Sequence, residues 1–152
     1  MKPEETIDYH VRAVWYGISK MYNQIGLEHD ITTSLGFVLL NIHTDEGTPA
    51  TKIAPLMGME SRSLTRMLKS MEEKGLIERK PNPADGRGVL IHLTEFGREK
   101  REYSRERVLT FNETIKNTIS EEKLNHFYEV AETITELVSN KKIYNQNDNS
   151  IK

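Results

Sequence analysis

A short stretch between residues 61 and 69 gathers side chains that can bind the phosphates and base edges of DNA. Hydroxyl groups bond phosphate oxygens, and arginine can form a bidentate pair with guanine. We expect either arginine of the stretch to contact guanine, and the hydroxyls to suit phosphates or a thymine methyl group. The alternative is that these side chains form an ordinary solvated helix face. The candidate residues are Ser61, Arg62, Ser63, Thr65, Arg66 and Lys69.

The periodicity of residues 60–74 predicts the helix that would present these side chains. Apolar residues recur at i, i+3, i+4 and i+7, which gives one buried face and leaves the polar residues on the other: Leu64, Met67, Leu68 and Met71. The acidic pair Glu72 and Glu73 is held back to the far end of this helix, and Gly75 is a typical residue to end it.

The residues after Gly75 predict a β-hairpin. Residues 76–80 and 89–93 have the composition of short strands, and the proline- and glycine-rich segment between them is expected to be a loop with residues 85–88 at its tip. Arg87 would project from that tip. A helix that is followed directly by such a hairpin indicates a winged helix, whose helix enters a major groove while the wing arginine reaches a neighbouring minor groove.

Two further polar residues belong to the predicted site. Asp85 would repel phosphate, so we expect it to hold an arginine in position through a charge-assisted bond. Arg79 is either that partner or a contact to the DNA backbone. The solvated-turn alternative remains open for Arg87.

These motifs resemble the MarR (multiple antibiotic resistance regulator) family. The resemblance lies in Thr65-Arg66, in residues 74–79, in Asp85-x-Arg87, in Leu93-Thr94 and in Gly97. It implies a mainly α fold with a small β-hairpin wing, a winged helix-turn-helix core flanked by dimerisation helices, and a wing arginine in the minor groove. The family often has two consecutive arginines after the aspartate. Here the first is Gly86, which leaves one cation fewer and a more flexible tip.

Composition limits the other possibilities. The chain has 152 residues and no cysteine, so disulfides, thiolate metal sites and cysteine redox sensing are excluded. The five histidines lack the spacing of metal ligands, and neither a metal nor a cofactor is expected. No apolar run approaches the ~20 residues of a membrane helix, and the N-terminus lacks a signal-peptide core. We therefore expect a soluble, cytoplasmic protein that consists of one domain, or of one domain with helical extensions.

The distribution of charge is more informative than the net charge of −2. Residues 52–101 hold 11 Lys and Arg against 7 Asp and Glu, a local charge of +4, and the remaining 10 basic and 16 acidic residues give −6. A basic reading module on an acidic scaffold is compatible with DNA binding, with weak non-specific affinity and a steep dependence on salt.

Three helices are expected before the recognition helix. The first spans residues 4–25 and ends at Gly26, and the second is capped within residues 30–34. Thr48 and Pro49 are expected as the N-cap and first residue of a third helix. Its inward residues would be Ile53, Ala54, Leu56 and Met57. Pro55 should bend this helix or stop it early, and the sequence assigns it no function.

Two helices are expected after the wing. Thr94 caps one over residues 95–118, and Ser120 opens another that ends near residue 140. Residues 141–152 are polar and expected to be disordered. The helices of residues 1–30 and 95–140 carry apolar stripes that the winged module of residues 31–94 cannot cover. We expect them to pair two chains in a homodimer, although they could instead fold back on their own chain.

The resemblance also implies a cleft for small, often aromatic or anionic effectors between the dimerisation helices and the reading module. The residues that could line it are Tyr9, His10, Arg12, Trp15, Tyr16 and Phe37. Plain core and interface packing is the alternative for each of them. His10 and Arg12 could neutralise an acidic ligand.

The sequence thus predicts a sequence-specific DNA-binding transcriptional regulator, usually a repressor in this family, which binds a pseudo-palindromic operator and responds to a small molecule. A winged-helix protein-interaction module is the alternative, with residues 62–69 facing an acidic partner. An enzyme is not expected, because the sequence offers no nucleophile–base pair, phosphate loop or metal constellation.

Overall fold

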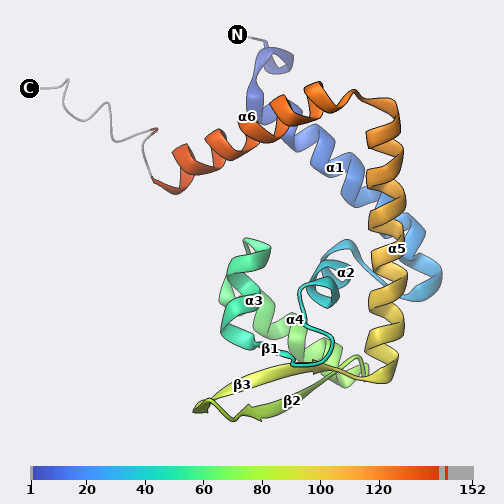
Figure 1. Ribbon diagram of the computed structural model, residues 1–152, viewed down its shortest axis with the longest axis vertical. Coiled ribbons are helices and arrows are strands. Elements are labelled where there is room, and N and C mark those ends of the chain that lie inside the picture. Colours follow the sequence, from blue (N-terminus) through green and yellow to red (C-terminus); the bar gives the residue numbers. More distant parts are fainter. Residues whose placement is uncertain (1, 141–142, 144–152) are drawn as a thin grey trace, which may run out of the picture. The chain divides into compact units, whose positions relative to one another are not determined.

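The computed structural model describes residues 2–140 and residue 143. They form eight helical segments and three strands, and Figure 1 shows their course. The helical elements are η1 (Pro3–Glu5), α1 (Ile7–Gly26), η2 (Leu27–His29), α2 (Thr33–Leu40), α3 (Ala50–Met57), α4 (Ser61–Glu73), α5 (Glu95–Thr118) and α6 (Glu121–Ser139). The strands are β1 (Thr48–Pro49), β2 (Ile77–Asn82) and β3 (Asp85–Leu93). The mainly helical fold class with a small sheet is confirmed.

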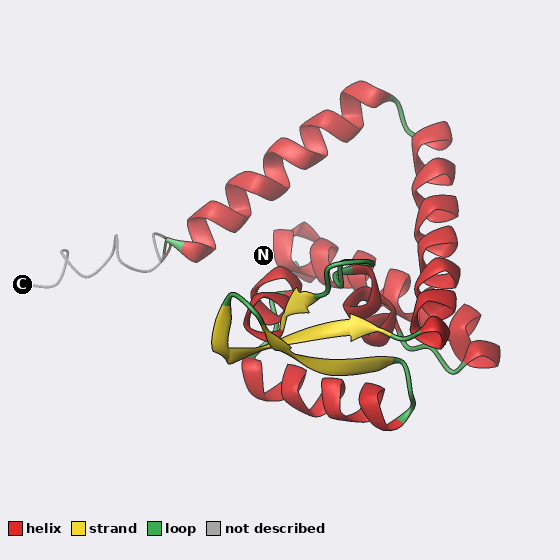
Figure 2. Ribbon diagram, turned by 60° about the horizontal axis from the view of Figure 1, so that its bottom comes forward, coloured by secondary structure: helices red, strands yellow, loops and turns green. Residues whose placement is uncertain are grey.

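The chain divides into two compact units, Met1–Val108 and Leu109–Lys152. The first unit contains the core, which α2, α3 and α4 form with the sheet; its most deeply buried large side chains are Leu39, Ile42, Ile53, Met71, Ile91 and Val38. The strands have the order β1-β3-β2 and are antiparallel. The long strands β2 and β3 run beside α4 (Figure 2). These elements have the arrangement of a winged helix, as the fold class predicted.

Strand β1 corrects the expectation for Thr48 and Pro49. Instead of opening α3, these residues pair with Ile91 and Leu90 of β3, and α3 begins at Ala50. Two features explain the pairing. Thr48 is buried and its hydroxyl accepts the N–H of His43 at 2.9 Å, and proline, which has no N–H, is tolerated on an edge strand.

Helix α3 continues through Pro55 and ends two residues later at Met57, where Gly58 adopts φ 59°. Pro55 therefore lies inside the helix and does not stop it at its own position. Ile53 and Ala54 are buried as expected, but Leu56 is 63% exposed, so the inward assignment of Leu56 was wrong. An eight-residue helix has one core-facing stripe, and Leu56 lies outside it.

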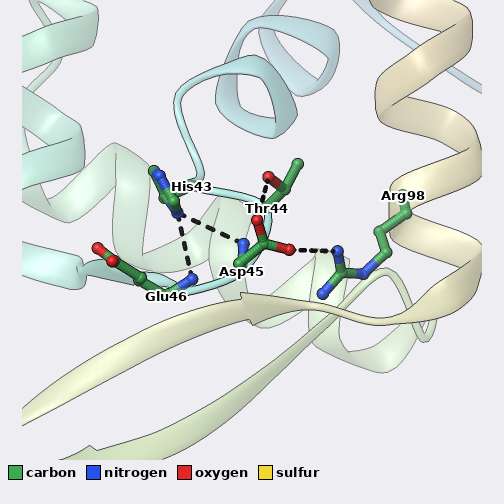
Figure 3. A network of polar contacts seen from close by, with 5 residues as sticks. All are labelled: His43, Thr44, Asp45, Glu46 and Arg98. Atoms are coloured by element: carbon green, nitrogen blue, oxygen red, sulfur yellow. Dashed lines mark hydrogen bonds and ion pairs between the residues drawn. The ribbon is translucent and has the colours of Figure 1, made fainter.

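The loop that leads from α2 into β1 is held by its own polar groups and by α5 (Figure 3). His43 Nδ1 accepts the backbone N–H groups of Asp45 and Glu46, at 3.4 and 3.1 Å. Asp45 also forms an ion pair with Arg98 of α5, with 3.5 Å between Oδ1 and the guanidinium. These bonds fix the path by which the chain passes from α2 to the sheet.

The outer helices follow the expected order with small shifts. Residues 3–5 form the short helix η1, so α1 begins at Ile7 and not at residue 4. The Thr94 hydroxyl accepts the N–H of Gly97 at 3.0 Å and caps α5, as predicted. Ser120 occupies the N-cap position of α6 without a side-chain cap bond. The expectation of disorder concerns residues 141–152, of which only Ile143 lies among the described residues.

Within the described part of the chain, none of the helices combines the length and the apolar character that a membrane span requires.

The close packing around Gly97 predicts that a larger residue there would destabilise the protein. A Cβ at this position would lie 1.9 Å from the backbone oxygen of Leu76, whereas a Cβ at Gly17 of α1 would meet nothing within 4 Å. Backbone cannot move aside cheaply, so Gly97→Ala should lower the free energy of unfolding by about 1–3 kcal/mol through overpacking. Gly17→Ala should leave it unchanged or raise it by about 0.5–1 kcal/mol, since alanine favours helix. Urea unfolding of both variants measures the difference. A Gly97→Ala protein as stable as the parent would contradict the close packing of α5 on Leu76.

Candidate nucleic-acid interface

Helix α4 has a buried face, an outer face and two flanks between them. Leu64, Leu68 and Met71 are buried against the core, and Met67 packs partly against it. Because each residue turns the helix by about 100°, Arg62, Arg66 and Lys69 share the opposite, outer face. Ser61, Thr65 and Glu72 fall on the flank that faces β2. Ser63 and Ser70 fall on the other flank. All six predicted DNA-contacting residues of α4 are exposed.

The cations of the outer face are free to meet a ligand. Within the described residues, Arg62, Arg66, Lys69 and the wing residue Arg87 form no ion pair, whereas several other cations do. Nearby acidic groups therefore do not neutralise these four charges. Phosphate oxygens or guanine edges could take up their donors.

The hydroxyl of Thr65 is already occupied. It donates to the backbone oxygen of Ser61 one helical turn earlier, at 2.8 Å. While that bond holds, Thr65 cannot donate to a phosphate. Its methyl group remains available, so contact with a thymine methyl suits it better than a phosphate contact does.

The wing differs from its predicted shape. Strand β3 begins at Asp85, so the turn consists of Pro83 and Ala84, and residues 85–88 were wrongly placed at the loop tip. The pairing passes from Pro81–Val89 directly to Asn82–Asp85, which leaves residues 86–88 of β3 without partners on β2. This irregularity is a bulge. Arg87 lies at its centre and is exposed.

Asp85 organises this bulge through the backbone. Its Oδ1 accepts the N–H of Arg87 at 3.1 Å, which is the bond of an Asx turn. Of the two alternatives for Arg79, pairing with Asp85 is not found, because its side chain pairs with Glu72. Asp85 thus shapes the chain that carries Arg87, and the glycines on either side of Arg87 leave its side chain unobstructed.

Arg79 has another partner. Ile77 is buried, and alternation along β2 directs Arg79 to the same side, towards α4. The Nε of Arg79 donates to Oε2 of Glu72 at 3.1 Å. Arg79 also lines a hollow of about 160 Å³ with Ser61 and Thr65 of α4 and Thr51 of α3. Sequence reasoning missed Glu72 and Thr51, because their roles depend on how α3, α4 and β2 meet.

On the other side of β2, two side chains of the strand, Glu78 and Lys80, form an ion pair with each other. Lys80 lies 2.6 Å from Glu78, and this hydrogen bond and charge lower the pKa of the Glu78 carboxyl. Lys80 is therefore partly neutralised, unlike the cations of the outer face of α4.

The predicted effector residues separate into groups. Trp15 and Phe37 face each other with ring centroids 6.2 Å apart, while Tyr9 contacts His10 at 5.4 Å. Tyr16 is 69% exposed, and Arg12 is also exposed on α1. Phe37 lines one hollow of the described structure and Trp15 lines another.

Two hollows occupy the region of Trp15 and Phe37. The larger, of about 550 Å³, lies among α1, η2, α2 and α4 and is lined by Trp15, Leu27 and Met67 together with Ser19, Asn23, Asp30, Ile31, Thr32, Thr33 and Ser34. The smaller measures about 30 Å³, has Phe37 in its wall, and includes Tyr22, Tyr103 and Arg107. Burial raises the pKa of the Tyr22 phenol above its ordinary value. The sequence did not identify Asn23, Met67 or Arg107 as lining residues, because no local pattern marks them.

Among the described residues, no group of three or more histidine, aspartate or glutamate side chains lies close enough to hold a metal ion.

Comparison with known proteins places this geometry in context. Residues 31–89 match the sequence model of the MarR family. The organic hydroperoxide resistance transcriptional regulator of Bacillus subtilis (strain 168) is 35% identical over 97 residues, which cover 64% of this chain and 66% of that protein. The reduced form of MarR from E. coli is 28% identical, with a TM-score of 0.69 over 84% of this chain and 96% of that chain. The S. aureus MepR–DNA complex shares the fold at 23% identity, with a TM-score of 0.75 over 89% of this chain and 98% of that chain.

Proposed function

The chain belongs to the MarR family of transcriptional regulators, and we propose that it is a homodimeric repressor that binds a pseudo-palindromic operator. Helix α4 of each copy would enter a major groove, and Arg87 would enter the adjacent minor groove. The observation that carries this proposal is the unpaired cationic face of Arg62, Arg66 and Lys69 beside the exposed Arg87, as seen within the described residues. Members of this family are regulators and not enzymes.

The MepR structure supports the DNA-binding part of the proposal, because that protein has the same fold and is bound to DNA. The hydrogen-bonding groups of α4 are also of suitable types. Arg62 and Arg66 could each form a bidentate contact with guanine, and Ser61 and Ser63 could bond phosphates. A role on DNA requires access to it, and we propose that the protein acts in the cytoplasm.

The dimeric part rests on apolar side chains that the single chain leaves uncovered. On α1, Ile7, Val11 and Val14 are each more than half exposed, and on α6 the same is true of Phe127 and Val130. Burying each such side chain is worth about 1.5–3 kcal/mol. We propose that residues 1–30 and 95–140 pair two copies about a two-fold axis, while residues 31–94 read DNA. The paired recognition helices would lie one turn of DNA apart, ~34–36 Å.

The hollow beside Trp15 could bind a small-molecule effector. Its volume of about 550 Å³ is within the range of ligand pockets, ~300–1,000 Å³. It touches α1 of the proposed dimerisation region and Met67 of α4, so a bound molecule could alter the position of the recognition helix. Asp30 is the charged residue of its lining, and the rest is apolar, hydroxyl or amide. An uncharged phenolic compound therefore suits this hollow better than an anion.

Cysteine oxidation cannot be the signal to which this regulator responds. The similar E. coli MarR structure is of a reduced form, and the Bacillus relative is named for organic hydroperoxide resistance. This chain has no cysteine. Effector binding would therefore act through its higher affinity for one of two dimer conformations.

Binding of the outer face of α4 to an acidic protein is the second candidate function. The exposed cations favour it as much as they favour DNA, but it requires neither the wing bulge nor a spacing of one DNA turn. Salt-dependent binding of the protein to DNA, with a preference for particular sequences, would reject this second function.

Substitutions of the two arginines test the DNA-binding proposal. Binding to the intergenic DNA upstream of the gene is measured by fluorescence anisotropy at several salt concentrations. Arg87→Ala should weaken binding and reduce the slope of log K against log salt by about one, because one phosphate-proximal cation is lost. Arg66→Ala should relax preference at particular base pairs, each worth about 1–3 kcal/mol. Parent-like binding by both variants would refute the assigned contacts.

Substitution of an exposed apolar residue of α6 tests the dimer. Phe127→Glu would place a charge in the proposed interface and should weaken dimerisation at least 100-fold, which corresponds to about 2.7 kcal/mol. Thr133→Glu, on the polar side of the same helix, is the matched control and should remain dimeric. Sedimentation equilibrium at micromolar concentrations distinguishes them. A parent protein that is monomeric there would contradict the proposal.

The single tryptophan reports on the proposed effector hollow. Phenolic compounds that stabilise the protein in a thermal-shift screen should also change the emission of Trp15. Ser34→Phe should fill the hollow, abolish that change and leave DNA binding intact. If a compound released the DNA from Ser34→Phe as readily as from the parent, the effector would bind elsewhere.

A further inference from the structure

We propose that Glu72 is a positioning residue, whose carboxylate orients Arg79 to bind a DNA phosphate between the recognition helix and the wing. The inference rests on the proposed DNA-binding function. It assigns a favourable role to an acidic residue on a surface that would face a polyanion.

The geometry singles out Glu72 from its neighbour. Glu72 lies on the flank of α4 that faces β2, where its Oε2 accepts the Nε–H of Arg79 at 3.1 Å. Glu73 is one residue further along and projects from the outer face, in line with Arg62, Arg66 and Lys69. It forms no ion pair among the described residues. The two glutamates therefore have the same charge and different surroundings.

The atoms used in the pair determine what remains available. Arginine carries five N–H donors in a rigid plane, one on Nε and four on the terminal nitrogens. The bond to Glu72 uses Nε. The terminal nitrogens can still bond phosphate oxygens, and the plane of the group is already fixed. A side chain that is ordered before binding loses less conformational entropy when it binds.

The location of Arg79 suits a phosphate. If α4 occupies a major groove and Arg87 the next minor groove, the sugar–phosphate strand that separates those grooves must pass between α4 and the wing. Arg79 projects from β2 towards α4 in this interval and shares its hollow with Ser61 and Thr65. Both side chains of the ion pair are partly accessible, with 34% of the Arg79 and 43% of the Glu72 side chain exposed.

The proposal predicts whether each substitution should raise or lower the affinity for DNA. Removing a negative charge close to DNA should strengthen binding, because the carboxylate repels phosphates at short range. That is the expected result for Glu73→Gln. If Glu72 positions Arg79, Glu72→Gln should have the opposite effect and weaken binding, although it removes the same charge from the adjacent residue.

The experiment measures the dissociation constant of the operator complex for the parent, Glu72→Gln, Glu73→Gln and Arg79→Ala. Glu73→Gln should bind about two- to fivefold more tightly, and Glu72→Gln at least about fivefold more weakly. Arg79→Ala should reduce the salt slope by about one. In the Arg79→Ala background, Glu72→Gln should no longer weaken binding. A general structural role of Glu72 would not depend on Arg79 in this way.

A stability control and three further results complete the test of the inference. Exposed ion pairs contribute little to stability, so Glu72→Gln should melt at the temperature of the parent. Tighter or unchanged binding by Glu72→Gln would overturn the inference, as would a loss of affinity that persists without Arg79. A parent protein that binds no upstream DNA would instead refute the proposed function itself.

Discussion

The burial of one face of α4 is the constraint on which the rest of the structure depends. Leu64, Leu68 and Met71 are almost fully buried against α2, α3 and the sheet. Each such side chain contributes about 1.5–3 kcal/mol when it leaves water, so the helix cannot rotate without a large loss. Its rotation fixes which residues face outward. The cations of the outer face point into solvent because Leu64, Leu68 and Met71 pack into the core on the opposite face.

The same packing places the wing. Ile77 and Ile91 anchor β2 and β3 in the core below α4, and Arg79 connects β2 to α4 through Glu72. Beyond that anchor the strands pair irregularly, and Asp85 shapes the bulge that carries Arg87. In the proposed complex this segment would follow a minor groove. With glycine at position 86, Arg87 would be the cation that the wing presents there.

Much of this arrangement could be predicted from the sequence. The recognition helix was predictable because Leu64, Leu68 and Met71 follow the helical period, and the cap of α5 because Thr94 precedes a charged helical run. Several features were not predictable. Strand β1 has only two residues, the wing bulge depends on cross-strand register, and the partner of Arg79 depends on the approach of β2 to α4. Each is set by contacts between segments that are distant in sequence. The exposure of Leu56 was missed because a short apolar run contains no information on which of its members faces the core.

Hydroxyl-radical footprinting of the operator complex tests the central claim most directly, which is that two α4 helices and two wings read DNA as one symmetric unit. We expect two protected backbone segments whose centres lie ~10–10.5 base pairs apart, with protection extending into the minor groove on the outer side of each. A single protected segment, or protection without two-fold symmetry, would contradict this claim.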